Sequence, residues 1–477
     1  MDQTSQGSPF GVALSSEPAA EIAVDLLVLP VREGHDPGLG LGDAVERARF
    51  TGGDGEELLL PRGPGDLFAA GAVLLVGVGA GGDEHTVRRA IGRVVPRLAD
   101  FPTVAVAFPH AHAVVEGVRL GGYRFDGYRS APPRSALREL VVLAAEDERE
   151  GVTRAGIVAD AVVFARDLVN TPAGDLVPAD LAERARAMAE THGLTARVLD
   201  AEDLAEGGFG GVLGVGAGSA NPPCLIEVSY PGDGHSGVVG LAGKGITFDS
   251  GGLAIKNLRA MSTMKSDMAG GATVLAVARA AAMLGLPTGV TAVVPAAENM
   301  VGGAATRPGD VLTHRDGRTT EVTDPDCEGR LVLADALAYL AESSPDVLID
   351  VATLTYAVMY ALGEDVTGVI GGDRRLVGEL LDAGARAGEP MWELPLWEPY
   401  GERLRSEVAD ARNEGGPYAD ATVAALFLRP FTAGLPWAHL DVAATAYRGS
   451  ATDLGPAGAT GVMVRTLVGY LESRTSY

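Results

Sequence analysis

The sequence has few cysteines and no long uninterrupted hydrophobic run. Its two cysteines, Cys224 and Cys327, are distant from each other in a chain of 477 residues, so no disulfide framework is predicted. No apolar stretch reaches about 18 residues without a charge or a glycine, which argues against a transmembrane helix. The first residues also lack the basic region and apolar run of a signal peptide. We therefore expect a cytoplasmic protein with no membrane partner.

Positive charge is also scarce. Lysine and arginine together number 38 against 63 aspartate and glutamate residues, which gives a net charge of −25 and a sequence pI near 4.7. Nucleic acids need basic patches that neutralise their phosphates, so this composition disfavours a nucleic-acid partner. The acidity instead favours solubility and attracts cations.

The length predicts two or three domains, and the chain divides near residues 150–154. We expect an N-terminal α/β domain over residues 1–152 and a larger catalytic domain over residues 153–477. In the first domain, Val24–Val31 and Ala72–Val76 are predicted to be buried strands, because both are continuous apolar runs.

The second domain alternates predicted strands with alanine-rich helices at Ala272–Leu284 and Thr422–Leu428. The predicted strands are Leu225–Tyr230, Gly237–Ala242, Thr291–Ala296 and Val347–Ala352. This alternation is typical of an α/β fold with a central, largely parallel sheet that has helices on both faces. Active sites in such sheets lie at the carboxyl ends of the strands.

A glycine-rich turn in the first domain suggests an alternative function. Gly77–Gly82 has the spacing G-x-G-x-x-G between a predicted strand and a predicted helix, and Asp100 follows about 20 residues later. A nucleotide-binding oxidoreductase is therefore the alternative hypothesis. Tight turns also use glycine for their backbone angles alone, so a single fingerprint of this kind is weak evidence.

One stretch of the second domain combines charges with apolar, glycine-rich surroundings. Lys244 follows an apolar strand, and a buried lysine is costly unless it is neutral, ion-paired or bound to a metal. Asp249 and Lys256 follow in the same stretch. Asp267 lies just before a predicted small-residue helix, where the helix N-terminus stabilises an anion.

A second stretch adds two more carboxylates and an arginine. Asp326 and Glu328 are two residues apart, which predicts that both lie on one side of an extended segment. Arg330 lies in the first turn of the following predicted helix, a favourable place for an anion site. Four converging carboxylates would repel one another unless cations neutralise them, and two divalent cations would do so. An ordinary cluster of buried ion pairs is the alternative.

Several motifs occur in the order found in a known enzyme family. They are G-K-G-I-T-F-D-S-G-G-L-A-I-K from Gly243, M-K-S-D-M-A-G-G-A from Met264, E-G-R-L-V-L-A-D-A-L from Glu328 and I-D-V-A-T-L-T from Ile349. In these motifs the chain resembles the leucyl aminopeptidase family, the cytosol aminopeptidases of the dinuclear-metal type (peptidase family M17). The resemblance covers roughly Val169 to Tyr447.

The resemblance implies a role for each matching residue. The tighter metal would be bound by Lys244, Asp249, Asp267 and Glu328. The more exchangeable metal would be bound by Asp249, Asp326 and Glu328. Lys256 would stabilise the tetrahedral intermediate, and Arg330 would anchor a bicarbonate that shuttles the proton.

The implied activity is metal-dependent hydrolysis of the N-terminal residue from peptides and amino-acid amides by a metal-bridged hydroxide. The resemblance implies two divalent metal ions per subunit, manganese or zinc with magnesium as a further option, and a bound bicarbonate. It also implies substrates with a free N-terminus and assembly as a homohexamer.

The substrate pocket departs from the family pattern. The resemblance places Met264, Thr353, Leu354, Thr355 and Tyr356 at the pocket for the first side chain of the substrate. Family members usually have glycine where this chain has Tyr356, and Pro325 and Cys327 also differ from the usual motif. A large ring at Tyr356 predicts a preference for smaller or unusual side chains.

Overall fold

The computed structural model describes residues 10–61, 67–132, 135–234 and 236–474. The chain forms two compact units, Met1–Val163 with Gly449–Ala457 and Phe164–Arg448 with Gly458–Tyr477. Helix α4 (Arg149–Asn170) runs across the point where the units divide. The domain boundary predicted after residue 152 therefore lies inside a continuous helix, because no proline or glycine pair interrupts the pattern there.

The first unit contains a six-stranded sheet in which only one edge strand is antiparallel. Its order is β1 (Gly11–Ser15), β6 (Glu139–Leu143), β5 (Thr103–Val106), β2 (Leu26–Val31), β4 (Ala72–Gly77) and β3 (Glu57–Leu60). Its helices are α1 (Gly42–Ala48), α2 (Glu84–Leu98) and α3 (Ala111–Gly121). Both strands predicted for this unit are present, and their side chains are almost entirely buried.

The glycine-rich turn after β4 packs against the chain itself. A Cβ atom at Gly77 would lie 2.0 Å from the carbonyl oxygen of Gly53, so glycine is required for this close approach. Asp83 caps helix α2 by accepting a 2.8 Å hydrogen bond from the backbone N–H of Thr86. These contacts explain the glycines without a nucleotide, and they give no support to the oxidoreductase alternative.

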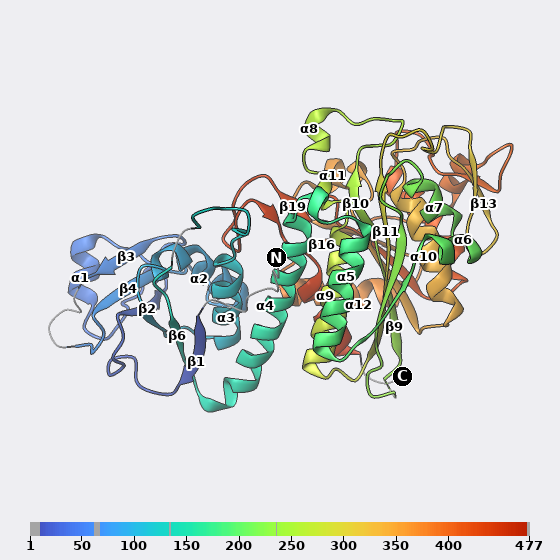
Figure 1. Cartoon of the computed structure of the whole chain (residues 1–477). Coiled ribbons are helices and arrows are strands. Elements are labelled where there is room, and N and C mark those ends of the chain that lie inside the picture. Colours follow the sequence, from blue (N-terminus) through green and yellow to red (C-terminus); the bar gives the residue numbers. More distant parts are fainter. Residues whose placement is uncertain (1–9, 62–66, 133–134, 235, 475–477) are drawn as a thin grey trace. The chain divides into compact units, whose positions relative to one another are not determined.

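The second unit is built on a nine-stranded sheet (Figure 1). Its order is β16 (Met391–Glu393), β15 (Thr367–Gly371), β18 (Trp437–Asp441), β14 (Val347–Ala352), β9 (Val238–Gly243), β11 (Gly289–Asn299), β8 (Cys224–Tyr230) and β7 (Thr195–Leu199), and β10 (Gly245–Asp249) pairs with β11. The central strands β18, β14, β9 and β11 are parallel, and antiparallel pairs occur only toward the two sides. The predicted fold class, an α/β protein with a largely parallel catalytic sheet, is confirmed.

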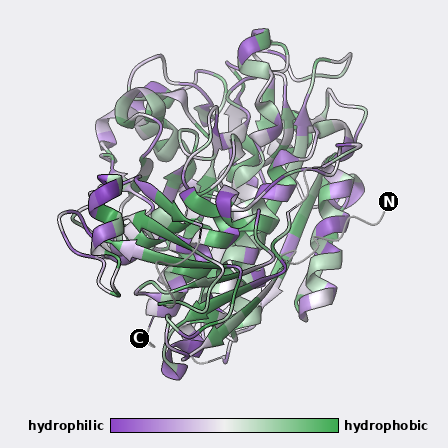
Figure 2. Ribbon diagram, turned by 90° about the vertical axis from the view of Figure 1, so that its left-hand side faces the viewer, coloured by the Kyte–Doolittle hydropathy of each residue, from purple (hydrophilic) through white to green (hydrophobic). Residues whose placement is uncertain are grey.

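Helices cover both faces of this sheet, with α9 on one face and α7 and α10 on the other (Figure 1). The helices of the unit are α5 (Pro178–His192), α6 (Ala201–Glu206), α7 (Gly210–Gly216), α8 (Leu258–Met261), α9 (Ala269–Leu284), α10 (Gly329–Glu342), α11 (Tyr356–Leu362), α12 (Arg374–Ala387), α13 (Asp420–Leu428) and α14 (Val464–Ser473). Short strands form two small sheets, β12 (Val311–Thr313) with β13 (Thr319–Glu321) and β17 (Ala411–Arg412), and β19 (Tyr447–Arg448) with β20 (Gly458–Ala459). The strands are predominantly hydrophobic, whereas outer helices carry hydrophilic residues as well (Figure 2).

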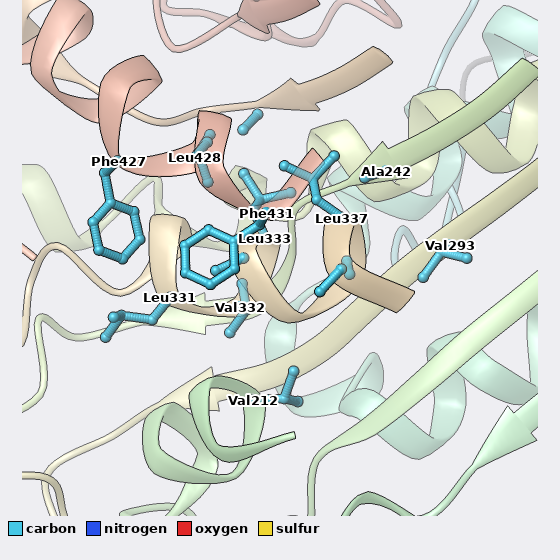
Figure 3. Close-up of a cluster of buried hydrophobic side chains, with 14 of the residues drawn as sticks. Val212, Ala242, Val293, Leu331, Val332, Leu333, Leu337, Phe427, Leu428 and Phe431 are labelled. Atoms are coloured by element: carbon cyan, nitrogen blue, oxygen red, sulfur yellow. The ribbon is translucent and has the colours of Figure 1, made fainter. Parts of the chain in front are cut away.

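Helix α10 is embedded in the main hydrophobic core of the second unit (Figure 3). Val332, Leu333 and Leu337 are fully buried. The surrounding core residues include Ala242 and Val293 from the sheet, and Phe427, Leu428 and Phe431 from the region of α13. Burial of this size fixes the position of α10, and therefore of the charged residues at its N-terminus.

One helical segment of the described residues, Met264–Leu284, is long and apolar enough to cross a membrane by length and composition. However, 78% of its most apolar part is buried inside the fold. A core helix of this composition meets the same criterion, and the small side chains of α9 allow it to pack closely against the sheet.

A buried ion pair links two central strands of the sheet. His439 on β18 pairs in register with Asp350 on β14, and the His439 Nδ1 lies 2.6 Å from Asp350 Oδ1. The indole N–H of Trp437 donates to the other Asp350 oxygen at 2.8 Å. Burial opposes a charged imidazole, but the adjacent Asp350 carboxylate raises the pKa of His439 to about 10.

We expect the Asp350–His439 pair to make stability depend on pH. The folded-state pKa of His439, about 10, lies above its reference value of 6.5. The stabilisation is therefore complete below pH 6.5 and is lost as pH rises through 10, with a total of a few kcal/mol. The check compares urea denaturation of the wild type with that of an Asp350→Asn/His439→Gln double variant, both in chelator, at pH 6 and pH 9.5. A stability difference that does not change between these pH values would contradict the charged pair.

Candidate metal centre

Lys244 lies at the junction of β9 and β10 and points its amine at two carboxylates. Its backbone is fixed, because its N–H donates to the carbonyl oxygen of Val351 at 3.1 Å. The Lys244 Nζ lies 2.8 Å from Asp267 and 2.7 Å from Glu328 Oε1. It also donates to the carbonyl oxygen of Thr353 at 3.0 Å. The side chain of Lys244 is only 4% exposed, so these three groups take the place of the water molecules that would otherwise solvate its ammonium group.

Lys256 contacts the other two predicted carboxylates. Its Nζ lies 2.8 Å from Asp249 Oδ2 and 2.5 Å from Asp326 Oδ1. Asp249 is the last residue of β10, and its other oxygen accepts hydrogen bonds from the side-chain amide of Asn299 and the backbone N–H of Gly251. The structure therefore brings together all four predicted carboxylates and both predicted lysines.

The carboxylate oxygens are arranged as a cation site. One oxygen each from Asp249, Asp326 and Glu328 lie within 4.8 Å of one another. Three buried oxygens accept no hydrogen bond within the described part of the chain, although a lysine amine lies close to each. They are Asp267 Oδ2, Asp326 Oδ1 and Glu328 Oε1. Buried anionic oxygens of this kind suit divalent metal ions, so the donor set fits the predicted metals.

Negative charge is in excess at this cluster, because four carboxylates face two ammonium groups. Burial, together with the neighbouring Asp249 carboxylate, raises the pKa of Asp326 to about 7. Burial also raises the pKa values of Asp249 and Asp267. The pKa of Glu328 is lowered despite its burial, because Lys244 and Lys256 both attract its charged form. Additional cations would allow every carboxylate to ionise.

The use of lysine in this chain is restricted to the neighbourhood of the site. The whole sequence contains three lysines, Lys244, Lys256 and Lys265, and arginine supplies the remaining basic side chains. An amine differs from a guanidinium in that it can lose its proton and donate a lone pair to a metal. The two lysines of the cluster are therefore chemically distinct from every arginine in the protein. The third lysine, Lys265, donates to the carbonyl oxygen of Asn170.

The segment that carries Asp326 and Glu328 is a turn, and the extended conformation predicted for it is wrong. The backbone N–H of Cys327 donates to the carbonyl oxygen of Asp324 at 3.1 Å, and Glu328 is helical as the N-cap of α10. The side chain of Asn413 holds the turn by accepting from the backbone N–H groups of Thr323 and Asp324 and by donating to the carbonyl oxygens of Asp324 and Cys327. Proline at position 325 also favours such a turn.

Two glycines permit the close approach of the site segments. A Cβ atom at Gly329 would lie 2.6 Å from the Lys244 Cε, so the first residue of α10 must be small for the lysine to pass. Gly251 has φ +85° and a Cβ there would lie 2.8 Å from Asp326 Oδ1. Glycine is favoured at Gly251 by both the backbone angle and the space.

The predicted pocket residues occupy different environments. The Thr353 hydroxyl donates to Asp267 Oδ1 at 2.7 Å and so belongs to the metal cluster itself. The Thr355 hydroxyl donates a 2.7 Å hydrogen bond to Asp441, and Thr355 is also the N-cap residue of α11. The Tyr356 ring is 49% exposed and its centroid lies 5.8 Å from the Lys256 Nζ, so it stands directly beside the catalytic cluster.

Met264 and Leu354 complete that predicted set. Met264 begins the short 3-10 helix Met264–Ser266 that precedes Asp267. Leu354 is partly buried and packs against the core around α10. The role of all five residues as a pocket stays a prediction.

Arg330 is buried in the first turn of α10, as predicted. One terminal nitrogen of its guanidinium donates to the carbonyl oxygen of Asn413 at 2.7 Å, and the other donates to Asp420 Oδ1 at 2.9 Å. The sequence reasoning missed Asn413 and Asp420 entirely. Asn299, which it also missed as a site residue, lies three residues after the predicted strand Thr291–Ala296, and this position near a strand end was the available signal.

A separate cleft in the second unit contains none of the predicted site residues. It has a volume of about 670 Å³ and is lined by residues such as Arg197, Phe209, Arg315 and Tyr339. Arg315 is already paired with Glu342, and the Tyr339 hydroxyl donates to Glu227 at 2.6 Å. The charges that line this cleft are therefore largely satisfied within the chain.

The chain is similar to known proteins along most of its length. The profile of the cytosol aminopeptidase family, catalytic domain, matches residues 163–468, and the profile of its N-terminal domain matches residues 38–132. The chain is 42% identical to a probable cytosol aminopeptidase of Roseiflexus castenholzii, over 95% of this chain and 97% of the relative. It is 40% identical to a probable cytosol aminopeptidase of Streptomyces coelicolor, over 97% and 98% of the two chains.

Solved structures show the same likeness. The bottromycin maturation enzyme BotP in complex with Mn has a TM-score of 0.87 and 40% identity, covering 94% of this chain and 99% of that one. A mutant of tomato leucine aminopeptidase has a TM-score of 0.88 and 31% identity, covering 98% of each chain. The resemblance seen in the sequence motifs is thus confirmed: this chain belongs to the cytosol aminopeptidase family and is a metal-dependent aminopeptidase.

Proposed function

We propose that this enzyme removes the N-terminal residue from peptides and amino-acid amides that have a free amino group. The observation that carries the proposal is the buried cluster in which oxygens of Asp249, Asp326 and Glu328 lie within 4.8 Å of one another beside two lysines. Such a cluster suits hydrolysis, because divalent ions held by its carboxylates would polarise a carbonyl group and activate a water.

The family resemblance implies ligands for two divalent ions, and the donor set of the cluster is compatible with them. Lys244, Asp249, Asp267 and Glu328 would bind one ion, and Asp249, Asp326 and Glu328 would bind the other. When bound, the two ions polarise the substrate carbonyl and lower the pKa of a bound water. Manganese is favoured by the likeness to BotP in complex with Mn, and zinc and magnesium suit the same oxygens.

The residues of the chain perform the remaining steps. Lys244 must lose its proton to act as a ligand. The metal ion would then replace the ammonium group as the positive charge that neutralises the surrounding buried carboxylates. Lys256 stays protonated, since its pKa is raised by Asp249 and Glu328 despite burial. A charged Lys256 can donate to the oxygen that becomes negative in the transition state.

Recognition of the substrate amine follows from the same cluster. An unblocked amine has a lone pair for a cation site and can donate to the acidic side chains, whereas an acylated amine has neither property to the same degree. Blocked peptides should therefore be poor substrates. The resemblance also implies a bicarbonate at Arg330, whose terminal nitrogens already contact Asn413 and Asp420. The proposed hydrolysis holds with or without that bound bicarbonate.

We further propose a cytoplasmic location and a homohexamer. The relatives are named cytosol aminopeptidases, which supports the location. The family resemblance supports the assembly, which light scattering of the purified protein would test. An acidic chain with a net charge of −25 favours peptide partners over nucleic acid.

We expect Lys256→Met and Asp249→Asn each to lower kcat for alanine amide by on the order of 10²-fold or more, because the first removes the cation that meets the developing oxyanion and the second weakens a ligand of both metal ions. Lys265→Met is the matched control, since Lys265 donates to a backbone carbonyl outside the cluster. Circular dichroism establishes that each variant is folded. Near-normal kcat in both Lys256→Met and Asp249→Asn would overturn the assignment of the site.

We expect Gly329→Ala to weaken metal binding by about tenfold or more, because its Cβ would lie 2.6 Å from the Lys244 Cε and would displace the amine. Gly378→Ala is the control: a Cβ at Gly378 on α12 meets nothing within 4 Å. Zinc titration calorimetry measures the affinity. In protein made with ¹⁵N-labelled lysine, only three lysines contribute side-chain signals, and the Lys244 signal should move on zinc binding. Equal zinc affinity of both variants would contradict the ligand role of Lys244.

We expect small substrate side chains to be preferred, because the Tyr356 ring stands next to Lys256. The wild type should have a higher kcat/KM for glycine and alanine amides than for leucine and methionine amides. Tyr356→Ala should shift the ratio toward leucine amide by about tenfold or more. Tyr360→Ala, on the same helix at an 89% exposed position, should leave the ratio unchanged. A leucine preference in the wild type would show that Tyr356 does not limit the pocket.

A further inference from the structure

Arg330 is a fully buried cation that is paired with a carboxylate of the same chain. Its side chain is 1% exposed, and a buried guanidinium needs a negative partner to offset the loss of water. Asp420, the first residue of α13, provides that partner through the 2.9 Å contact between Asp420 Oδ1 and the Arg330 Nη2. The pair joins α13 to the N-terminus of α10, next to the predicted metal ligand Glu328.

The contact occupies the edge of the guanidinium that a bicarbonate would use. The Nε and Nη2 atoms of an arginine form one edge, which binds two oxygens of a planar carboxylate or of a similar anion. In this chain Asp420 contacts Nη2, and the Arg330 Nε is buried with no hydrogen-bond partner among the described residues. A bicarbonate at this edge would have to displace Asp420. The remaining terminal nitrogen is already bound to the carbonyl oxygen of Asn413.

The local backbone presents Asp420 in this position. Ala419, the residue before it, has φ +57°, a left-handed conformation that non-glycine residues rarely adopt. Asp420 lies in the first turn of α13, where a carboxylate is favourable. Its side chain is 27% exposed, in contrast to the buried Arg330. Asp420 can therefore exchange a proton with water while the arginine holds it in place.

We infer that Asp420 is the resident anion of this site and accepts the proton that a bicarbonate would otherwise accept. The inference rests on the proposed function. As the water oxygen forms its bond to the substrate carbonyl carbon, one water proton passes to the Asp420 carboxylate, directly or through one further water. When the C–N bond breaks, the nitrogen keeps the electron pair and receives that proton, which releases a neutral amine and restores the carboxylate.

This assignment predicts a specific response to bicarbonate. The wild type should hydrolyse alanine amide at the same rate in carbonate-free buffer and in added bicarbonate. Asp420→Asn should lose activity by on the order of 10²-fold in carbonate-free buffer, because the proton acceptor is gone. Added bicarbonate should restore a large part of that loss, because a neutral amide competes for the guanidinium edge far less strongly than a carboxylate does. Asp420→Gly should behave in the same way, and thermal unfolding identifies any variant that fails to fold.

Binding provides a readout that does not depend on turnover. Broadening of the ¹³C signal of labelled bicarbonate should be saturable with metal-free Asp420→Asn and absent with the metal-free wild type. Glu398→Gln is the matched control, since it removes the carboxylate from the exposed Arg429–Glu398 pair of the same unit. It should neither bind bicarbonate in a saturable way nor gain activity from it.

The outcomes separate the two proposals. Stimulation of the wild type by bicarbonate, or full activity of Asp420→Asn without it, would overturn the role of Asp420 and leave the aminopeptidase assignment intact. Failure of the metal-loaded wild type to hydrolyse any peptide or amide would overturn the proposed function. In that case the ¹³C binding experiment still decides whether Asp420 occupies the anion position.

Discussion

The clustering of four mutually repelling carboxylates, three of them buried, is the constraint on which the rest of the second unit depends. Asp249, Asp267 and Glu328 are nearly inaccessible to solvent, so water cannot screen them. The fold offsets their repulsion with the two lysine amines and with two helix N-termini, because Asp267 lies just before α9 and Glu328 caps α10. The raised pKa of Asp326, about 7, indicates that this compensation is incomplete without further cations. Metal binding and local stability are thus two aspects of one electrostatic balance.

The parallel strands make this convergence possible. β9, β10 and β14 end at one edge of the sheet, and the segments that follow them carry Lys244, Asp249 and Thr353. The hydrophobic core around α10 (Figure 3) fixes the helix that begins next to Glu328, so this carboxylate cannot move away to relieve the repulsion. Rigid support of this kind is what a preorganised catalytic site requires.

Much of this arrangement could be predicted from the sequence, because strand ends and helix starts are local signals. The six charged residues and Arg330 were identified from apolar runs, glycines and motif order, and the largely parallel sheet from the alternation of strands and helices. The turn at Asp326 was predicted as extended, because side-chain spacing alone does not reveal the hydrogen bonds that Asn413 makes to it. Asn413 and Asp420 lie 83 to 90 positions from the groups they contact, and no local pattern connects them.

The individual character of the enzyme lies in residues that do not bind the metal ions. Metal ligands tolerate little change, because each replacement leaves a buried charge or an empty coordination position. Residues that do not bind the metal ions can change the reaction without destroying the site. Tyr356 alters the space beside Lys256, and Asp420 alters what Arg330 binds. Lys244 and Lys256 fit the same logic, whereas Lys265 donates to a backbone carbonyl outside the cluster. Arginine serves wherever a permanent charge is sufficient, and an amine is kept for the site at which a proton must be lost or a developing charge met.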